Sequence, residues 1–171
     1  DIAPAGIHYA QEPEPFPTAA FETLWMIRVL RRYLAARRAD VLFASGNTYA
    51  IVAAAMKLLL GRRCPPVVIK LSNDLYRQDM IAPYRAAYHW WLRVQGRMFD
   101  HFVGMAQPMR PEIARFMRVP DDRITIIEDP SLEERQFAAL SALPRPAELP
   151  LAPHYVAVGR LARQKNFPLL L

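Results

Sequence analysis

Short apolar runs alternate along the chain with longer segments in which apolar residues recur every three or four positions. Four runs are short and mostly apolar, and they predict strands at Val41–Ser45, Val67–Leu71, His101–Ala106 and Ile124–Glu128. Strands of this kind, separated by helices, are typical of a parallel sheet that helices cover on both faces. The pattern therefore predicts an α/β fold, with a parallel sheet and flanking helices.

The longer segments predict four helices around these strands. The first covers residues 19–38, and the second runs from Thr48, a good N-cap, to Gly61. The third covers residues 83–99 and the fourth residues 109–118. On the first helix the apolar residues that share a face are Leu24, Ile27, Leu30 and Leu34. On the third helix the residues down one side are Tyr84, Tyr88, Trp91, Leu92, the polar Gln95 and Phe99. We expect these faces to point into the molecule.

Prolines divide the chain into parts. Of the 16 prolines, several fall in two groups that favour extended connectors, one at residues 13–17 and one at residues 144–153. After the second group the pattern restarts, with a strand at 154–158, a loop at 159–165 and a helix that begins at Asn166. A new strand, loop and helix after a connector predicts a second domain. Because the sequence starts without Met and ends in an apolar run, we expect it to be a fragment of a longer protein.

The composition excludes several classes of protein. With 53% hydrophobic and 22% charged residues the chain is globular, not disordered. Lys57 interrupts the longest apolar segment, residues 50–60, which is far shorter than the roughly 20 residues that cross a bilayer. The single cysteine, Cys64, excludes an internal disulfide, and no Cys/His spacing indicates a structural zinc. A reducing, cytoplasmic setting fits these features best.

The positive charge comes from arginine. The net charge is +6, with 19 Arg against 3 Lys. This excess fits recognition of phosphates by planar guanidinium groups, and it fits equally a GC-rich genome that favours Arg codons. The cations are spread along the chain without a known nucleic-acid-binding module, so we expect no nucleic-acid partner.

Two turns carry candidate binding residues. Ser45, Gly46 and Asn47 follow the first predicted strand, and Ser72-Asn73-Asp74 follow the second. Loops at the carboxyl ends of parallel strands line ligand crevices, although ordinary turn and cap chemistry explains these residues equally well. Asp74 could act as a base, but the cap of a helix is the favoured role. None of the histidines forms a nucleophile motif with Ser or Cys.

Three segments, in order, resemble a known family. Residues 156–167, Val-Ala-Val-Gly-Arg-Leu-Ala-Arg-Gln-Lys-Asn-Phe, resemble the opening of the donor-binding domain of family 4 glycosyltransferases, the retaining GT-B enzymes. Residues 119–130 resemble the last strand of the N-terminal domain of that family, and residues 39–43 resemble its middle strand. The resemblance implies a Rossmann-like sheet in each of two domains that face each other across a cleft.

The resemblance also implies a division of the chain and a function. Residues 1–130 would be part of the N-terminal, acceptor-side domain, 131–153 the link, and 154–171 the start of the nucleotide-sugar-binding domain. The implied enzyme is bacterial and serves polysaccharide biosynthesis. It transfers a sugar from a nucleotide-diphosphate sugar to a glycan or lipid-linked acceptor, with retention at the anomeric carbon and without a cofactor or metal. The alternative is a noncatalytic α/β interaction module or a degenerate relative.

By the same resemblance Gly159, Arg160 and Lys165 bind the donor diphosphate. Negative charge grows on the diphosphate as the sugar leaves, so cations aimed at its oxygens lower the barrier. Gly159 lets the backbone approach, Arg160 offers a two-pronged contact and Lys165 adds a point charge. An ordinary solvated loop with two surface cations is the competing interpretation.

Departures from the family pattern leave the sugar open. Family members usually carry a His after the strand that corresponds to Val67–Leu71, and Ser72-Asn73-Asp74 stand there instead. This turn and Ser45–Asn47 would face the acceptor or the sugar. The basic first helix and the third helix, with Trp90 and Trp91, indicate peripheral contact with the inner face of a membrane, or simply a solvated face.

Overall fold

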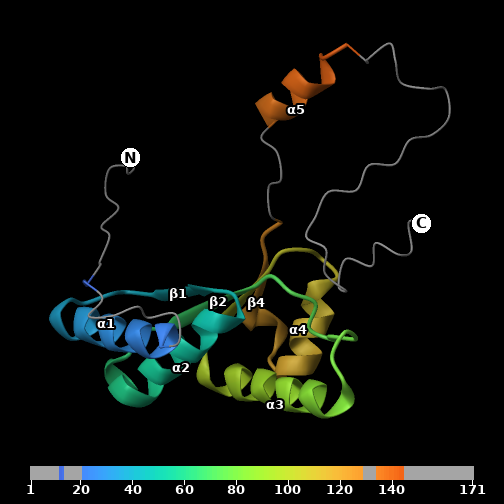
Figure 1. The fold of residues 1–171 in the computed structure, drawn as a ribbon. Helices are drawn as coiled ribbons and strands as arrows, with labels where there is room; N and C mark the ends of the chain where they lie inside the picture. The colour runs from blue at the N-terminus through green and yellow to red at the C-terminus, as the bar shows by residue number, and fades with distance from the viewer. Residues whose placement is uncertain (1–11, 14–20, 129–133, 145–171) are drawn as a thin grey trace.

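The computed structural model describes residues 12–13, 21–128 and 134–144 of the chain. The side chains of Asn47 and Thr48 lie outside the described part. The elements follow one another as α1 (Glu22–Ala36), β1 (Leu42–Ser45), α2 (Asn47–Leu60), β2 (Val67–Leu71), α3 (Ala82–Met98), β3 (His101–Gly104), α4 (Met109–Met117), β4 (Ile124–Ile126) and α5 (Glu134–Ser141) (Figure 1). Short 3-10 turns at Gly61–Arg63 and Asp121–Arg123 precede β2 and β4.

The four strands form one parallel sheet in the order β1-β2-β3-β4. Ser45 is in register with Lys70, and Leu71 with Gly104, so the carboxyl ends of the strands share one edge. This confirms the predicted α/β fold with a parallel sheet and flanking helices. Each strand lies beside the one that precedes it in the sequence. Every connection therefore crosses over to the next strand in the same direction along the sheet. Right-handed crossovers then place every connecting helix on the same side.

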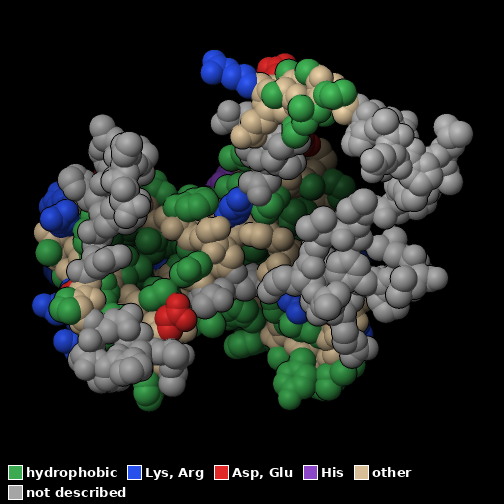
Figure 2. Space-filling model, turned by 45° about the horizontal axis from the view of Figure 1, so that its top comes forward, with side chains coloured by type: hydrophobic (Ala, Val, Ile, Leu, Met, Phe, Trp, Pro, Cys, Tyr) green, Lys and Arg blue, Asp and Glu red, His purple; other side chains and the backbone are tan. Residues whose placement is uncertain are grey.

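Helices α1 to α4 accordingly lie on one side of the sheet (Figure 1). The expectation that helices cover both faces is therefore wrong for the described residues. The two faces of β2 differ in burial. Val67, Ile69 and Leu71 are buried under the helices, whereas Val68 and Lys70, on the other face, are half-buried. On the other side of β1, Phe43 is 57% exposed. In Figure 2, which turns this side toward the viewer, hydrophobic side chains are visible near the middle of the molecule.

The core lies between the sheet and the helix layer. Leu92 of α3 and Ile113 of α4 are fully buried in one cluster with the strands, together with Phe102 of β3. Each such side chain contributes about 1.5–3 kcal/mol through the hydrophobic effect. The helices also pack side by side, α1 on α2 and α3 on α4. These contacts fix the edge of the sheet where the candidate residues lie.

The contact between α3 and α4 depends on Gly96. A Cβ at this position would overlap the carbonyl oxygen of Met117 and lie 2.9 Å from its carbonyl carbon. Only glycine allows the backbones of the two helices to approach so closely. Helix α4 is thereby held against α3, with its first turn at the carboxyl edge of the sheet.

The amino edge of the sheet is tied together by Asp100. Its Oδ2 accepts hydrogen bonds from Lys57 Nζ at 2.6 Å and from the Val67 N–H at 2.7 Å. Arg123 donates from Nε to the Asp100 carbonyl at 3.0 Å, and its Nη2 donates to the Phe99 carbonyl. Residues from α2, β2 and the turn before β4 therefore meet at the start of β3.

The ends of the elements differ in detail from those that the sequence predicts. β2 is confirmed residue for residue, whereas β3 ends at Gly104 because the next N–H, of Met105, donates to Met109 Sδ at 3.4 Å. The N-cap of α2 is Gly46 and not Thr48, and its φ of +91° is accessible to glycine without strain. The end of α2 at Gly61 is confirmed.

Two apolar residues expected on inward faces point to solvent. Leu24 near the start of α1 is 64% exposed, and Tyr84 near the start of α3 is 69% exposed. Both stand in the first turn of their helix. The other predicted residues of these two faces are buried or half-buried. A further difference is α5, which the sequence did not predict in the link, although residues 134–141 are mostly good helix formers.

Candidate functional site

The turn after β1 is fixed to the neighbouring strand at the carboxyl edge of the sheet. The Gly46 N–H donates to the Lys70 carbonyl at 2.9 Å, so the turn is held against the end of β2. Ser45, the last residue of β1, is exposed, and Asn47 is the first residue of α2. The backbone here is well positioned to present Ser45 to a ligand.

The turn after β2 also lies at this edge. Ser72, Asn73 and Asp74 are all exposed. Asp74 Oδ1 accepts a hydrogen bond from the Tyr76 N–H at 2.8 Å, which forms an Asx-turn. The favoured interpretation of Asp74 as a helix cap is therefore wrong, because α3 begins only at Ala82.

The loop that follows is held in one shape. Leu75 is buried, and its carbonyl lies 3.2 Å from Nε2 of His89 on α3. Arg77 has a positive φ of 51° and donates from Nε and Nη2 to the two oxygens of Asp79, each at 2.8 Å. This two-pronged hydrogen bond lowers the pKa of the Asp79 carboxyl and raises that of the Arg77 guanidinium. A loop fixed in this way can hold a binding surface in a set geometry.

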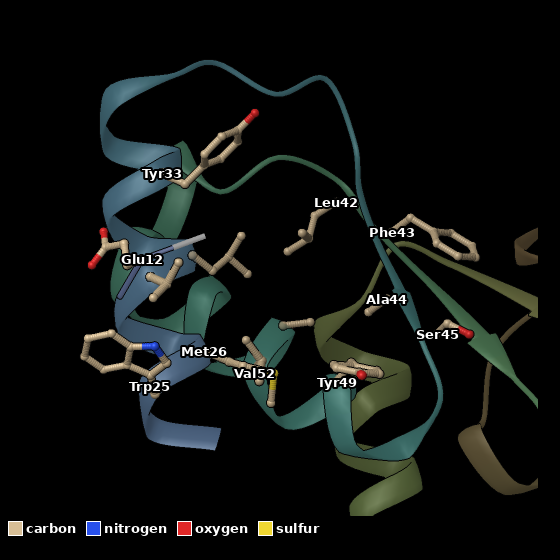
Figure 3. A pocket seen from close by; sticks show the side chains of 13 residues that line it. Glu12, Trp25, Met26, Tyr33, Leu42, Phe43, Ala44, Ser45, Tyr49 and Val52 are labelled. Carbon is tan, nitrogen blue, oxygen red and sulfur yellow. The ribbon is translucent and has the colours of Figure 1, made fainter. Parts of the chain in front are cut away.

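A first hollow of about 890 Å³ lies beside β1, the edge strand of the described sheet, between α1 and α2 (Figure 3). Leu42 and Ala44 point from β1 toward α1, and Tyr33 points in from the end of α1. The lining is mostly apolar, with the hydroxyls of Ser45 and Tyr49 at the carboxyl end. The lining residues are Glu12, Trp25, Met26, Val29, Leu30, Tyr33, Leu42, Phe43, Ala44, Ser45, Tyr49, Val52 and Ala53.

A second hollow, of about 510 Å³, lies between the loop after β2 and α4, and it extends from the first to the last turn of that helix. Its lining is mixed, with carboxylate, guanidinium, amide and aromatic groups. The lining residues are Asp74, Tyr76, Gln78, Pro111, Glu112, Arg115 and Phe116. Because α4 starts just after β3, the end of the hollow with Asp74 and Pro111 is near the carboxyl edge of the sheet, where α/β proteins bind ligands, and the rest of it runs along α4.

One predicted site residue lines each of these two hollows. Ser45 lines the first and Asp74 the second, so their side chains do not share one pocket. Gly159, Arg160 and Lys165 lie outside the described residues, and their role stays a prediction. Sequence reasoning missed Tyr76, Glu112 and Arg115. The available signal was that the helix predicted at 109–118 begins at the same edge of the sheet as Asp74.

Two further properties belong to the described part of the chain. No group of three or more His, Cys, Asp or Glu side chains there is placed to hold a metal ion. Among the same residues, no helix has the length and hydropathy that crossing a bilayer requires.

A parallel sheet with helices between its strands and hollows at its carboxyl edge defines an α/β protein of the Rossmann-like class. The family model of the glycosyl transferase 4-like domain matches residues 2–129, which is most of the chain. The chain therefore belongs to this glycosyltransferase family, and the predicted resemblance to family 4 is confirmed. No curated protein matches the chain.

Proposed function

We propose that this glycosyltransferase moves a sugar from a nucleotide-diphosphate sugar to a glycan or lipid-linked acceptor, with retention at the anomeric carbon. The observation that carries the proposal is the family match over residues 2–129, the part of the chain that forms the sheet and both hollows. In this proposal residues 1–130 form part of the acceptor-side domain, residues 131–153 the link and residues 154–171 the start of the donor-binding domain. We propose a cytoplasmic enzyme.

The donor side is assigned to Gly159, Arg160 and Lys165. Breaking the bond between sugar and diphosphate leaves negative charge on the phosphate oxygens and an oxocarbenium-like sugar. A guanidinium and an ammonium group aimed at those oxygens stabilise this charge. Cations supplied by the protein can do this without a metal or other cofactor, and we propose that this enzyme uses neither.

The acceptor side is assigned to the carboxyl edge of the sheet. Ser45 ends β1, Gly46 and Asn47 follow it, and the Ser72–Asp74 turn follows β2, so hydroxyl, amide and carboxylate groups stand along the edge. A sugar hydroxyl both donates and accepts hydrogen bonds, and these groups provide both kinds of partner.

We also propose that the helix layer contacts an anionic membrane at the inner face. No Asp or Glu lies in α2, in the 3-10 turn after it, or in α3. Leu58 on α2 is 77% exposed and Trp90 on α3 is 64% exposed. Exposed basic residues accompany them, namely Arg62, Arg63, Arg93 and Arg97. Apolar and aromatic side chains with cations and no carboxylates match the chemistry of an anionic lipid surface.

The donor assignment is tested by calorimetry on the protein expressed from its complete coding sequence. Titration with uridine, guanosine, adenosine and thymidine diphosphates should reveal one that binds. We expect Arg160→Ala and Lys165→Ala each to weaken that binding about tenfold or more, since each removes a charge-assisted contact to phosphate. Arg163→Ala is the matched control from the same loop and should bind as the wild type does. Unchanged binding in both site variants would overturn the assignment.

Turnover separates the enzyme from a noncatalytic α/β module. The enzyme should release nucleoside diphosphate from a matching nucleotide sugar when an acceptor extract is added, and product analysis should show retention. A protein that binds no nucleoside diphosphate and releases none would instead be an interaction module or a degenerate relative.

A further inference from the structure

We infer that the second hollow, between the loop after β2 and α4, is a subsite for one pyranose ring of the acceptor. This inference rests on the proposed function and adds to it the ring-binding residues, Tyr76, Glu112 and Arg115 above all. One end of the hollow, with Asp74 and Pro111, is near the carboxyl edge of the sheet to which the acceptor is assigned.

Aromatic rings form one wall of the hollow. The rings of Tyr76 and Phe116 have their centroids 6.0 Å apart at an angle of 58°, and Phe116 lies 4.6 Å from the ring of His89. Contacts of this kind hold an aromatic group in one orientation. Tyr76 is 42% exposed, so part of its ring remains available to a ligand. A pyranose presents a face of C–H groups, and such a face packs well on an aromatic ring.

Polar groups surround this wall. Asp74 and Glu112 supply carboxylate oxygens that accept hydrogen bonds from sugar hydroxyls, while Arg115 and Gln78 supply donors. The Asx-turn fixes the Asp74 carboxylate, and the Arg115 guanidinium lies 5.5 Å from the centroid of the Phe116 ring. Hydroxyls on the rim of a pyranose need donors and acceptors together, and this lining offers both.

The charges of the lining favour a neutral polyhydroxyl ligand. The two carboxylates of Asp74 and Glu112 repel an anion such as a phosphate, since Arg115 is the one cation among the lining residues. The same Arg115 opposes a cationic ligand. An aromatic wall also favours a ligand that has an apolar face. A sugar ring, uncharged and with one apolar face, satisfies all of these groups.

Titration of the isotope-labelled protein, followed by NMR, tests the subsite directly. The probes are the methyl glycosides of mannose, glucose, galactose and N-acetylglucosamine. We expect at least one to bind with a Kd in the millimolar range and to shift the amide signals of the Tyr76 loop and of α4.

Variants then identify the groups that bind. We expect Tyr76→Ala, Glu112→Gln and Arg115→Ala each to raise the Kd about fivefold or more, and Tyr76→Phe, which keeps the ring, to raise it far less. Phe137→Ala removes an exposed aromatic from α5 and Arg31→Ala an exposed cation from α1; neither residue lines the hollow, and the two variants serve as matched controls. Both controls should bind as the wild type does.

Failure of this inference is distinguishable from failure of the proposed function. If no glycoside binds, or if the three variants bind as tightly as the wild type, the subsite assignment is overturned, whatever the donor titration shows. If the glycosides bind as expected but no nucleoside diphosphate binds and no sugar is transferred, the proposed transferase reaction fails instead. When transfer is measurable, Tyr76→Ala should raise the KM for the acceptor and leave the affinity for the nucleoside diphosphate unchanged.

Discussion

At the scale of single residues, Gln95 is the least expected member of the core. It is fully buried on the inner face of α3, and neither Nε2 nor Oε1 has a hydrogen-bond partner among the described residues. A buried amide without partners lowers stability, because it has lost its hydrogen bonds to water. The helical pattern predicted that Gln95 lies on the inward face, but not that it stands there unpaired.

Gln95→Met should therefore stabilise the fold. Methionine has a similar length and volume and no polar group to desolvate, so we expect the free energy of unfolding in urea to rise by about 1–3 kcal/mol. Gln95→Glu, the matched control, buries a charge and should lower it. A loss of stability in Gln95→Met would mean that the amide is satisfied in solution, for example by a buried water.

Asp100 gives the fold a pH dependence. Burial by itself raises the pKa of this carboxyl, but the hydrogen bonds from Lys57 and the Val67 N–H together lower it below its ordinary value of 3.8. A carboxyl whose pKa is lower in the folded state contributes stability above the unfolded pKa. That contribution is lost as the pH falls through the folded pKa. The side chain of Asp100 is 48% exposed, so solvent keeps the contribution small, below about 1 kcal/mol.

Urea unfolding of the wild type and Asp100→Asn at a series of pH values measures this contribution. We expect the wild type to be the more stable at neutral pH, and the difference to shrink below about pH 4. The same comparison in a Lys57→Met background should show a smaller difference, since the ion pair is already gone. A difference that is constant down to acidic pH would contradict the assignment.

At the scale of elements, the end of α4 is strained. Arg118 follows the helix with φ 57° and ψ 50°, the left-handed conformation in which glycine is usually found. A side chain in this conformation costs about 1–2 kcal/mol, because its Cβ crowds the following carbonyl oxygen.

Comparison of Arg118→Gly with Arg118→Ala isolates this strain. Both variants remove the exposed side chain, but only glycine relieves the backbone, so we expect Arg118→Gly to be the more stable by about 1 kcal/mol in urea unfolding. Equal stability of the two variants would show that the helix end relaxes without cost.

The bounds of the elements also show which structural features a local sequence pattern predicts and which it misses. The bounds of β2, residues 67–71, were predicted without error. This strand is a short, mostly apolar run that Pro65 and Pro66 precede, and every second side chain in it is buried. The start of α2 was missed because Thr48 has a better capping side chain than Gly46. The positive φ of Gly46 depends on its hydrogen bond to Lys70, a residue distant in sequence.

At the scale of the whole molecule, the lack of carboxylates in α2 and α3 leads to a prediction on membrane binding. We expect the protein to sediment with vesicles that contain about one third anionic phosphatidylglycerol, and to be released as salt screens the attraction. Leu58→Glu and Trp90→Glu should each reduce the bound fraction several-fold.

Ile127→Glu is the matched control for these variants. Ile127 is also apolar and 59% exposed, but it follows β4 at the carboxyl edge of the sheet, outside the helix layer. It should sediment with the vesicles as the wild type does. Equal binding of all variants, or binding to neutral vesicles alone, would contradict a membrane contact through α2 and α3.

The sequence by itself determined the kind and order of the elements from α1 to β4, since apolar periodicity and turn residues are local. It also determined the family, because the matched motifs are contiguous. Only the tertiary structure decided that the helices share one side of the sheet, that Ser45 and Asp74 line different hollows, and that Tyr76 meets Glu112 and Arg115. These relations join residues far apart in the chain. They depend on strand order and helix packing, which no local pattern records.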